Sequence, residues 1–304
     1  DAVHAPTPLA PPGPQRGRDL VVTVHDTVPW THPAGLTPRG VGWHRRMIAR
    51  AARRADALVV PTAAVAADLP RHVSCRAGVH VVGAGVSAAI GSPVAGGPGG
   101  DGAGGSVLGG QARERQAETI AARLDLPPRY VLAVGTLEPR KGIDTLVAAL
   151  AEPNAPGLPV LLAGQPGWGR IDPVQLARRA GLAPGRVRVL GRISDAELGV
   201  VLHRATVLAA PSQAEGFGLP VLEAMAAGVP VVHSDAPALV EVAGGAGEVF
   251  ARNDPAGLAT ALRAVLADGA RAEAMIAAGR GRVRQFTWER TARRVWSVHL
   301  ALRS

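Results

Sequence analysis

Short apolar runs alternate with amphipathic stretches along most of the chain. The runs are rich in valine, leucine and alanine, which is typical of strands buried on both faces of a parallel sheet. The strands that this pattern predicts are residues 20–24, 57–60 and 79–82, followed by 130–134, 160–163, 187–190, 206–209, 229–232 and 248–250. Strands that alternate with helices in this order predict an α/β fold with parallel sheets.

The intervals between the runs carry apolar residues at helical spacing. Residues 43–54 and 143–150 each place aliphatic side chains on one face, and residues 195–204 begin with a capping-box motif. The last segment, residues 286–304, predicts a terminal amphipathic helix. The side chains expected to pack are Trp288, Val295, Trp296 and Leu300.

A glycine-rich segment divides the chain into two lobes. Half of residues 91–110 are glycine, which predicts a flexible linker over residues 91–112. Residues 1–90 then form a first lobe, and residues 113–285 form a second lobe whose six strands suffice for a doubly wound sheet. The first lobe shows only three strands, and it starts at Asp1 rather than at methionine. We therefore expect the first lobe to be incomplete.

The composition excludes several classes of protein. Hydrophobic residues make up 47% of the 304 and charged residues 19%, which excludes a disordered chain. The single cysteine, Cys75, excludes a disulfide framework and favours a reducing, cytoplasmic location. No apolar run approaches the roughly 20 residues that a bilayer-spanning helix needs.

The net charge of +9 favours anionic partners. Aromatic residues are only 3% and the basic residues are dispersed, so nucleic acid is not expected among them. Arginines give the helix at 43–54 a basic face, which we interpret as a solvated surface. The alternative is peripheral contact with an anionic membrane, at its inner face. The arginines are Arg45, Arg46, Arg50, Arg53 and Arg54.

The sequence EGFGLPVLE, residues 215–223, has the features of a phosphate site. It follows a predicted strand, and Pro220 suits the first turn of the helix that comes next. The backbone amides of Phe217, Gly218 and Leu219 would then point from a helix N-terminus into the crevice at the strand ends. A phosphate group is the ligand that such a crevice favours.

Two carboxylates flank this predicted anion site. Glu215 lies on its approach and Glu223 lies inside the first turn of the helix, and both can accept hydrogen bonds from sugar hydroxyls. For Glu223 an equally simple interpretation is that it complements the helix dipole. Glu215 precedes the helix and is not explained in that way.

A second segment, GTLEPRKG at residues 135–142, joins a predicted strand to the helix at 143–150. It places Arg140 and the sole lysine of the chain, Lys141, at a helix N-terminus. Each cation there opposes the helix dipole, at a cost of up to about 1 kcal/mol. Two such cations predict a bound anion whose attraction outweighs their unfavourable interaction with the helix dipole. The alternative is a solvated basic turn.

These motifs together resemble those of the retaining glycosyltransferases of family 4, which have the GT-B fold. The resemblance covers most of the chain. Further matching segments are VHAP at 3–6, VVTVHD at 21–26, VVGAGVS at 81–87, VRVLGRISDAEL at 187–198 and FTWE at 286–289. The resemblance implies two Rossmann-like parallel-sheet lobes facing a cleft, with the nucleotide sugar on the second lobe, the acceptor on the first, and the terminal helix packing back toward the first lobe.

The resemblance also implies roles in donor binding. Glu223 would hold the ribose hydroxyls, while Glu215 and the amides of Phe217, Gly218 and Leu219 would contact the donor sugar. The diphosphate would be clamped by the loop after the first strand of the second lobe, with Arg192 and Ile193 contacting the base. The clamp residues are Gly135, Thr136, Arg140 and Lys141.

His25 matches the family's histidine that faces the transferred sugar, although a histidine at a strand end is also often a hydrogen-bonded structural group. Thr136 departs from the pattern, because many members carry an arginine there. The family's upstream strand and glycine-rich loop are not found before VHAP, which again suggests an incomplete first lobe.

The reaction implied is transfer of a hexose, with mannose favoured, from a nucleoside-diphosphate sugar to a glycan or lipid-linked acceptor, with retention. No Asp-x-Asp pair occurs in the sequence, so we expect a site without metal or other cofactor. Two alternatives stay open: a GT-B nucleotide-sugar epimerase, and a non-catalytic nucleotide-sugar-binding remnant.

Overall fold

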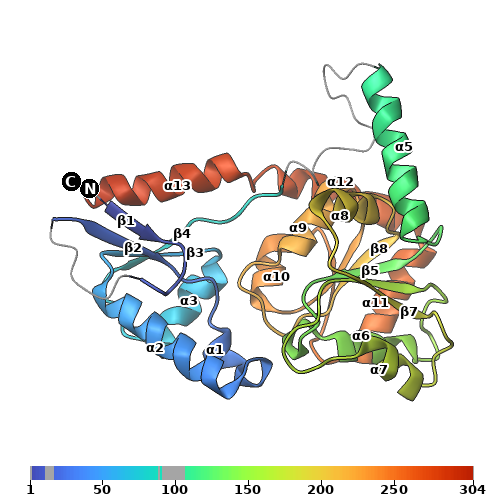
Figure 1. The fold of residues 1–304 in the computed structure, drawn as a ribbon, viewed down its shortest axis with the longest axis horizontal. Helices are drawn as coiled ribbons and strands as arrows, with labels where there is room; N and C mark the ends of the chain where they lie inside the picture. The colour runs from blue at the N-terminus through green and yellow to red at the C-terminus, as the bar shows by residue number, and fades with distance from the viewer. Residues whose placement is uncertain (1, 11–16, 88–89, 91–106, 304) are drawn as a thin grey trace.

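The computed structural model describes residues 2–10, 17–87, 90 and 107–303. It consists of two α/β lobes side by side, each built on a parallel sheet with helices packed against it (Figure 1). The predicted fold class is confirmed.

The first lobe has a four-stranded sheet in the order β1-β2-β3-β4. Its strands are β1 (Ala2–Ala5), β2 (Asp19–Thr23), β3 (Ala57–Val60) and β4 (Gly78–Val81). Its helices are α1 (Val28–Thr31), the 3-10 turn η1 (Pro33–Gly35), α2 (Pro38–Arg54) and α3 (Ala63–His72). All of β3 is buried, whereas only Ala5 is buried in the edge strand β1. The sequence did not predict β1, because an edge strand with one buried residue leaves no apolar run.

The second lobe has a six-stranded sheet in the order β10-β9-β8-β5-β6-β7. Its strands are β5 (Val131–Val134), β6 (Val160–Ala163), β7 (Val187–Gly191), β8 (Val207–Ala210), β9 (Val231–Ser234) and β10 (Glu248–Phe250). Its helices are α5 (Val107–Arg123), the 3-10 turn η2 (Pro139–Lys141), α6 (Ile143–Leu150), α7 (Pro173–Arg179), α8 (Asp195–His203), α9 (Leu219–Ala226), α10 (Pro237–Ala243), α11 (Pro255–Ala267) and α12 (Gly269–Val283). The strand order reverses between β5 and β8, which makes the carboxyl ends of these strands the ligand-binding position of a doubly wound sheet.

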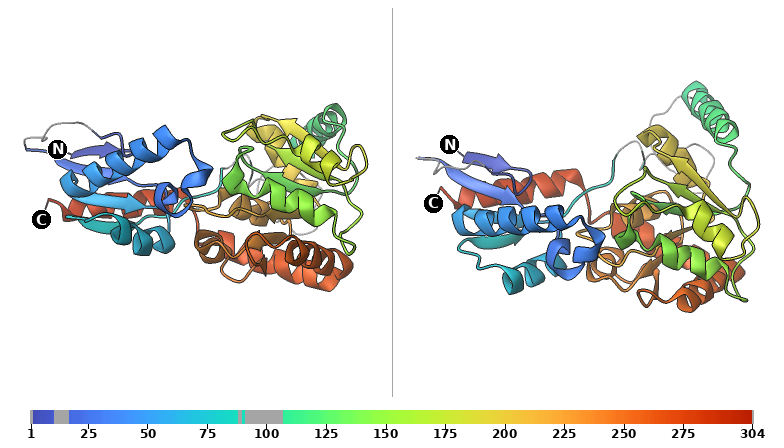
Figure 2. Two further views of the ribbon diagram at one scale, coloured as in Figure 1. Left: turned by 90° about the horizontal axis from the view of Figure 1, so that it is seen from below. Right: turned by 60° about the horizontal axis from the view of Figure 1, so that its bottom comes forward.

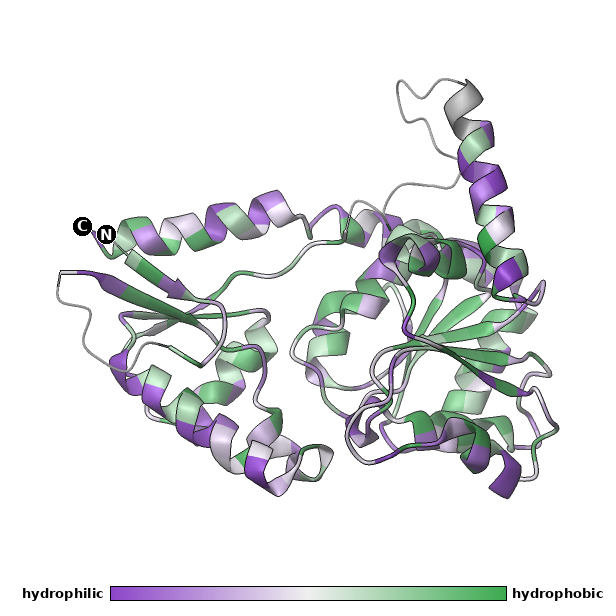
Figure 3. Cartoon of the chain, in the orientation of Figure 1, coloured by the Kyte–Doolittle hydropathy of each residue, from purple (hydrophilic) through white to green (hydrophobic). Residues whose placement is uncertain are grey.

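The cores explain why these elements form. The strands of the second sheet are strongly hydrophobic (Figure 3), and apolar side chains from the helices bury both of its faces. The expected linker falls mainly on residues 91–106, which lie outside the described residues. Residues 107–112 belong to α5, so this helix begins before the predicted boundary.

The terminal helix α13 (Trp288–Ala301) lies along the first lobe in the views of Figure 1 and Figure 2. Val295 and Val298 pack against the first sheet. The expected contact residues were therefore partly wrong: Trp288, Trp296 and Leu300 are 55%, 66% and 62% exposed. The part of α13 that contacts the first sheet is therefore narrower than the apolar face of the helix.

The basic face of α2 is divided between two environments. Arg46, Arg53 and Arg54 are exposed, whereas Arg45 is half-buried and its Nε donates to the Pro29 carbonyl at 2.9 Å. At least one of the five arginines thus binds helix α1 of its own lobe.

Candidate functional site

The loops after β5 and β8 meet at the switch point of the second sheet. Residues 135–142 follow β5 and residues 211–218 follow β8. A side chain on Gly142 is excluded, because its Cβ would lie 2.0 Å from the Pro211 carbonyl oxygen, and its φ of +65° also favours glycine. This close approach brings the two predicted motifs together.

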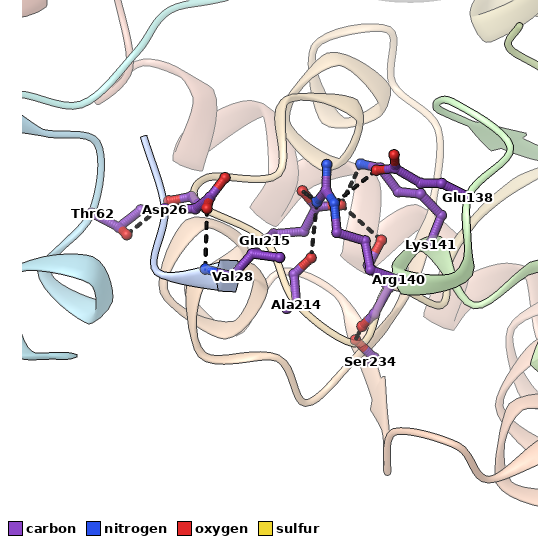
Figure 4. Close-up of polar contacts among 11 residues, drawn as sticks. Asp26, Val28, Thr62, Glu138, Arg140, Lys141, Ala214, Glu215 and Ser234 are labelled. Atoms are coloured by element: carbon purple, nitrogen blue, oxygen red, sulfur yellow. Dashed lines mark hydrogen bonds and ion pairs between the residues drawn. The ribbon is translucent and has the colours of Figure 1, made fainter. Parts of the chain in front are cut away.

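A cluster of opposite charges forms where the loops meet (Figure 4). Lys141 Nζ donates to Glu215 Oε1 at 2.5 Å, and Arg140 donates to Glu215 Oε2 at 3.1 Å. Ser212 Oγ donates to Glu215 Oε1 at 2.8 Å. Arg140 also pairs through Nε with Glu138 Oε1 at 2.7 Å. Two cations and two carboxylates thus form one hydrogen-bonded network.

The network fixes the charge state of its members. Burial would raise the pKa of Glu215, but the charges of Lys141 and Arg140 outweigh burial and hold that pKa below its usual range. Burial would likewise lower the pKa of Arg140, but the carboxylates of Glu215, Glu138 and Asp26 raise it above its ordinary value. Both groups are therefore charged at neutral pH.

The structure shows which anion faces the two cations. We expected Arg140 and Lys141 to require a bound anion, and Glu215 supplies it from within the chain. Glu215 was expected to contact the donor sugar, which stays a prediction; in this structure its carboxylate pairs with the two cations. An incoming diphosphate would have to share or replace these contacts.

Gly135 and Thr136 begin the β5 loop but have different surroundings. Gly135 lies beside the Lys141 side chain and lines a small pocket with Lys141 and Glu215. The Thr136 methyl group instead faces Gly167 in the loop after β6. Thr136 is therefore part of loop packing rather than of the cation cluster.

Glu223 lies in a less polar environment than Glu215. It is in the second turn of α9, which follows Gly218 as N-cap, so it is not in the first turn as expected. The dipole interpretation therefore loses its basis. Burial, and secondarily the Asp195 carboxylate, raises the pKa of Glu223 to about 7.

Glu223 lies near the turn that is expected to contact the base. Helix α8 packs against α9, and its first residue, Asp195, acts electrostatically on Glu223. Arg192 and Ile193 lie just before α8; Arg192 is exposed and Ile193 packs on the second-lobe core. The structure therefore brings the expected ribose and base residues to one side of α9.

The N-terminus of α9 lies at the cleft. Phe217, Gly218 and Leu219 line the cleft, and the first-turn amides of an α-helix lack intrahelical partners. The Phe217 ring is buried and packs edge-to-face on Phe286, with centroids 5.7 Å apart. The Phe217 side chain therefore anchors the loop. Only its backbone amide is then available to contact a ligand.

His25 follows β2 and faces the second lobe. Its ring Nε2 lies 2.8 Å from the Pro6 carbonyl oxygen, which can only accept, so Nε2 carries the proton. A Cβ on Gly216 would lie 1.9 Å from the His25 carbonyl oxygen, so the backbones of the two lobes touch at this point.

The space between the lobes is a cleft of about 500 Å³. His25 and Asp26 line it from the first lobe, and Arg140, Lys141 and Glu215 line it from the second. Trp288 and Val295 of α13 contribute an apolar wall. This volume and mixed lining suit a small-molecule site.

Several residues at the site were not predicted from the sequence. Glu138 and Ser212 hold Arg140 and Glu215, and Thr62 and Glu241 join the two lobes. The proximity of Glu138 to Arg140 in the sequence was a usable signal, whereas the contacts of Glu241 span more than 170 positions. Among the residues that the structure describes, no group of three or more histidine, cysteine or acidic side chains is placed to hold a metal ion. In the same part of the chain, none of the helices is long and apolar enough to span a membrane.

Two family models match the chain. The model described as "Glycosyl transferases group 1" matches residues 114–282, more than half of the chain. The model described as "Glycosyltransferase Family 4" matches residues 1–89. The two matches correspond closely to the second and the first lobe.

Individual proteins resemble the chain to different extents. O-antigen chain mannosyltransferase B of Escherichia coli is 39% identical over 163 residues, which are 53% of this chain and 42% of that protein. The chain thus matches less than half the length of that relative. Sucrose-phosphate synthase of Thermosynechococcus elongatus superposes with a TM-score of 0.77 at 26% identity, over 99% of this chain and 73% of that one. Anabaena HepE, solved in complex with UDP and glucose, has a TM-score of 0.74 at 20% identity, over 94% of this chain and 72% of its own.

Proposed function

The chain belongs to the glycosyl transferases of group 1, and from this premise we propose that it transfers a hexose from a nucleoside-diphosphate sugar to an acceptor, with retention of configuration. The observation that carries the proposal is the partly buried cluster of Lys141, Arg140 and Glu215 at the switch point of the second sheet. Mannose is the favoured sugar because of the named activity of the Escherichia coli relative. The acceptor is a glycan or a lipid-linked sugar.

The donor is proposed to lie along the second lobe. Glu223 would accept hydrogen bonds from the ribose, near the turn formed by Arg192 and Ile193. The diphosphate would lie at the N-terminus of α9 and against Lys141 and Arg140, where backbone amides and cations favour an anion. The sugar would then extend into the cleft toward His25.

Charge development in the reaction fits this placement. Negative charge builds up on the diphosphate as its bond to the anomeric carbon breaks, and the sugar gains oxocarbenium character. Lys141, Arg140 and the α9 amides are oriented before the reaction, so they would stabilise the leaving group at little reorganisation cost. The departing phosphate would take the proton of the acceptor hydroxyl, which attacks from the same face.

No metal or other cofactor is assigned to this step, because the two cations supply the positive charge. Turnover is expected to be unaffected by EDTA. Turnover that EDTA abolishes and added divalent metal restores would contradict the assignment.

The donor assignment is tested by a thermal-shift panel of GDP-, UDP-, ADP- and dTDP-sugars. One of them should raise Tm, and product analysis with that donor and candidate acceptors should show a new glycosidic bond of retained configuration. Conversion of the donor without an acceptor would indicate the epimerase instead. Binding without transfer to any acceptor would indicate a non-catalytic protein.

Contact with an anionic membrane is a further part of the proposal. The exposed arginines of α2, Arg46, Arg53 and Arg54, would provide it. Flotation with vesicles of anionic and of neutral lipid tests it: Arg46→Glu with Arg53→Glu should abolish binding to the anionic vesicles alone.

A further inference from the structure

Helix α10 of the second lobe reaches across to the first lobe through one carboxylate. Glu241 Oε1 accepts from the Ala63 amide at 2.8 Å, and Glu241 Oε2 accepts from the Ala64 amide at 2.8 Å. Ala63 and Ala64 are the first two residues of α3. The two lobes are thus joined by a bidentate contact between a side chain and a helix N-terminus.

The physical chemistry of α3 explains why this contact forms. The first amides of a helix have no intrahelical acceptor, and the helix dipole favours a negative charge beside them. The first turn of α3 contains no acidic residue, and the side chain of its N-cap, Thr62, accepts from the Val65 amide and not from the amides of Ala63 and Ala64. Glu241 therefore supplies from the other lobe the acceptors that α3 lacks.

The N-cap of the same helix contacts the EGFG loop. Thr62 Oγ1 donates to the Gly216 carbonyl at 2.9 Å, and Figure 4 shows the Thr62 side chain beside the loop. Thr62 is only 1% exposed. Gly216 follows Glu215 directly and lies against the His25 carbonyl. One helix N-terminus thus contacts both helix α10 and the loop that carries Glu215.

We propose that Glu241 and Thr62 are positioning residues that couple closure of the lobes to the placement of the 215–218 loop opposite His25. This inference rests on the proposed function, because it assigns the closed arrangement to the transfer step. Neither residue contacts the reacting atoms. Both act through α3 and through Gly216.

The surroundings of the contact suit a clamp that opens and closes. A cavity of about 290 Å³ lies beside it, lined by Ala64 and Val65 of α3 and by Pro237 and Ala238 of α10. The two helices are therefore not joined there by continuous apolar packing. Directed hydrogen bonds form at one relative position of the lobes and are lost once the lobes separate.

The first test measures the contact itself in the full chain. Glu241→Gln removes the charge and one of the two acceptors, so amide hydrogen exchange in the peptide covering residues 61–66 should become about tenfold faster. Glu248→Gln is the matched control, because Glu248 is also a second-lobe carboxylate but pairs with Arg271 within its own lobe. Unchanged exchange in Glu241→Gln, with unfolding equal to wild type, would overturn the clamp.

The second test separates positioning from binding. The 215–218 loop is also held within the second lobe, where Glu215 accepts from Arg140, Lys141 and Ser212. Its contacts to a nucleoside diphosphate should therefore not depend on Glu241, and calorimetry should give the same Kd for wild type and Glu241→Gln. The kcat for transfer should fall about 10- to 100-fold, since small displacements of reacting groups carry penalties of this size. Thr62→Val should show the same split, and Thr62→Ser, which keeps the hydroxyl, should recover most of kcat.

The outcomes distinguish the clamp from the proposed function. Wild-type protein that neither binds a nucleotide sugar nor transfers one would refute the proposed function, while hydrogen exchange would still decide whether the clamp forms. Equal kcat in wild type, Glu241→Gln and Thr62→Val would refute the coupling to transfer. A weaker nucleotide Kd in Glu241→Gln would also refute it, because Glu241 would then act on the donor site itself.

Discussion

The two edges of the cleft are built in different ways. The edge on the second lobe consists of buried, interlocked charges, with the Lys141 and Glu215 side chains 13% and 11% exposed. The edge on the first lobe presents exposed His25, which is held by one contact to a backbone carbonyl. A preorganised charge cluster is costly to build unless it is used, so we assign recognition of the diphosphate to the second lobe.

The difference also indicates how the two edges cooperate. The second lobe keeps its charge cluster within its own loops, so donor binding does not require closure. The first lobe reaches the cluster through Gly216, Thr62 and the backbone of His25. It also does so through the Asp26 carboxylate, which acts on Arg140, and through Gly35, whose added Cβ would lie 3.2 Å from Arg140 Cβ. Variants of the second-lobe edge should therefore change both the nucleotide Kd and kcat. Variants of the contact between the two edges should change kcat alone.

The largest effect is expected from Lys141→Met on the second edge. The change removes one of two cations facing the diphosphate and leaves Glu215 with Arg140 as its cationic partner. We expect kcat/KM to fall on the order of 100- to 1,000-fold, because a preorganised charge at the leaving group is lost. The nucleotide Kd should also rise. Arg293→Met, which breaks an exposed pair with Glu289, is the control for loss of an ion pair. Activity within twofold of wild type for Lys141→Met, in a stably folded protein, would contradict the assignment.

Gly216→Ala tests the contact between the edges. The added Cβ would lie 1.9 Å from the His25 carbonyl oxygen, so the lobes must move apart. We expect kcat to fall up to about 100-fold with an unchanged nucleotide Kd. Small-angle scattering should show a larger radius of gyration. Gly157→Ala is the control, because its Cβ would meet no atom within 4 Å. A closed Gly216→Ala protein of normal kcat would show that this contact is dispensable.

The sequence predicted those parts of the molecule that depend on local pattern. Buried runs such as residues 57–60 and 160–163 coincide with β3 and β6, because a strand buried on both faces must be apolar throughout. Strand β1 was not predicted, because only one of its four residues is buried. The packing face of α13 was partly mispredicted, since its partner surface lies more than 210 positions away in the chain.

The same distinction holds within the site. The two loops could be predicted to meet, because both follow strands at the switch point of one sheet. The sequence could not predict that Glu215 neutralises Lys141 and Arg140. These ion pairs depend on side-chain geometry between residues that are 74 and 75 positions apart. The bond from Glu241 to α3 likewise depends on how two separately folded lobes are placed.

A smaller effect is the pH dependence of donor binding. It arises from Glu223, whose pKa is raised, and not from Glu215, whose pKa is lowered. Because the pKa of Glu223 is raised to about 7, binding of a nucleotide sugar to the ionised form should release a proton. The affinity should rise about tenfold from pH 6 to pH 8, a range in which the diphosphate of the sugar nucleotide does not titrate. Calorimetry in buffers of different ionisation enthalpy measures the number of protons released on binding. Glu223→Gln should remove the dependence, and a pH dependence that persists in Glu223→Gln would refute it.

The same group affects stability with a defined sign. A carboxyl whose folded pKa is raised stabilises the fold below its unfolded pKa of about 4.5, and this contribution is lost as pH rises through about 7. Urea unfolding of the free protein should therefore show that Glu223→Gln gains stability relative to wild type between pH 5 and pH 8. A constant difference over that range would mean that Glu223 ionises normally.

The smallest effect is expected at the turn before α8. Hydrogen bonds from the Ser194 amide and hydroxyl, followed by Arg123, lower the pKa of Glu197 to about 2. Its stabilising contribution is present above the unfolded pKa of about 4.5 and is lost as pH falls through about 2. Glu197→Gln should lower the free energy of unfolding by less than about 1 kcal/mol at pH 7, since ionic contacts at the protein surface contribute little. A donor KM changed more than threefold would contradict a purely capping role.

Isothermal titration of a nucleoside diphosphate and of the corresponding nucleoside, with the base chosen from the thermal-shift panel, measures the phosphate contribution of the second edge. With Lys141, Arg140 and the α9 amides facing the diphosphate, it should bind on the order of 100-fold more tightly than the nucleoside at low salt, and added salt should narrow the difference. Equal dissociation constants would show that no diphosphate is held at this cluster.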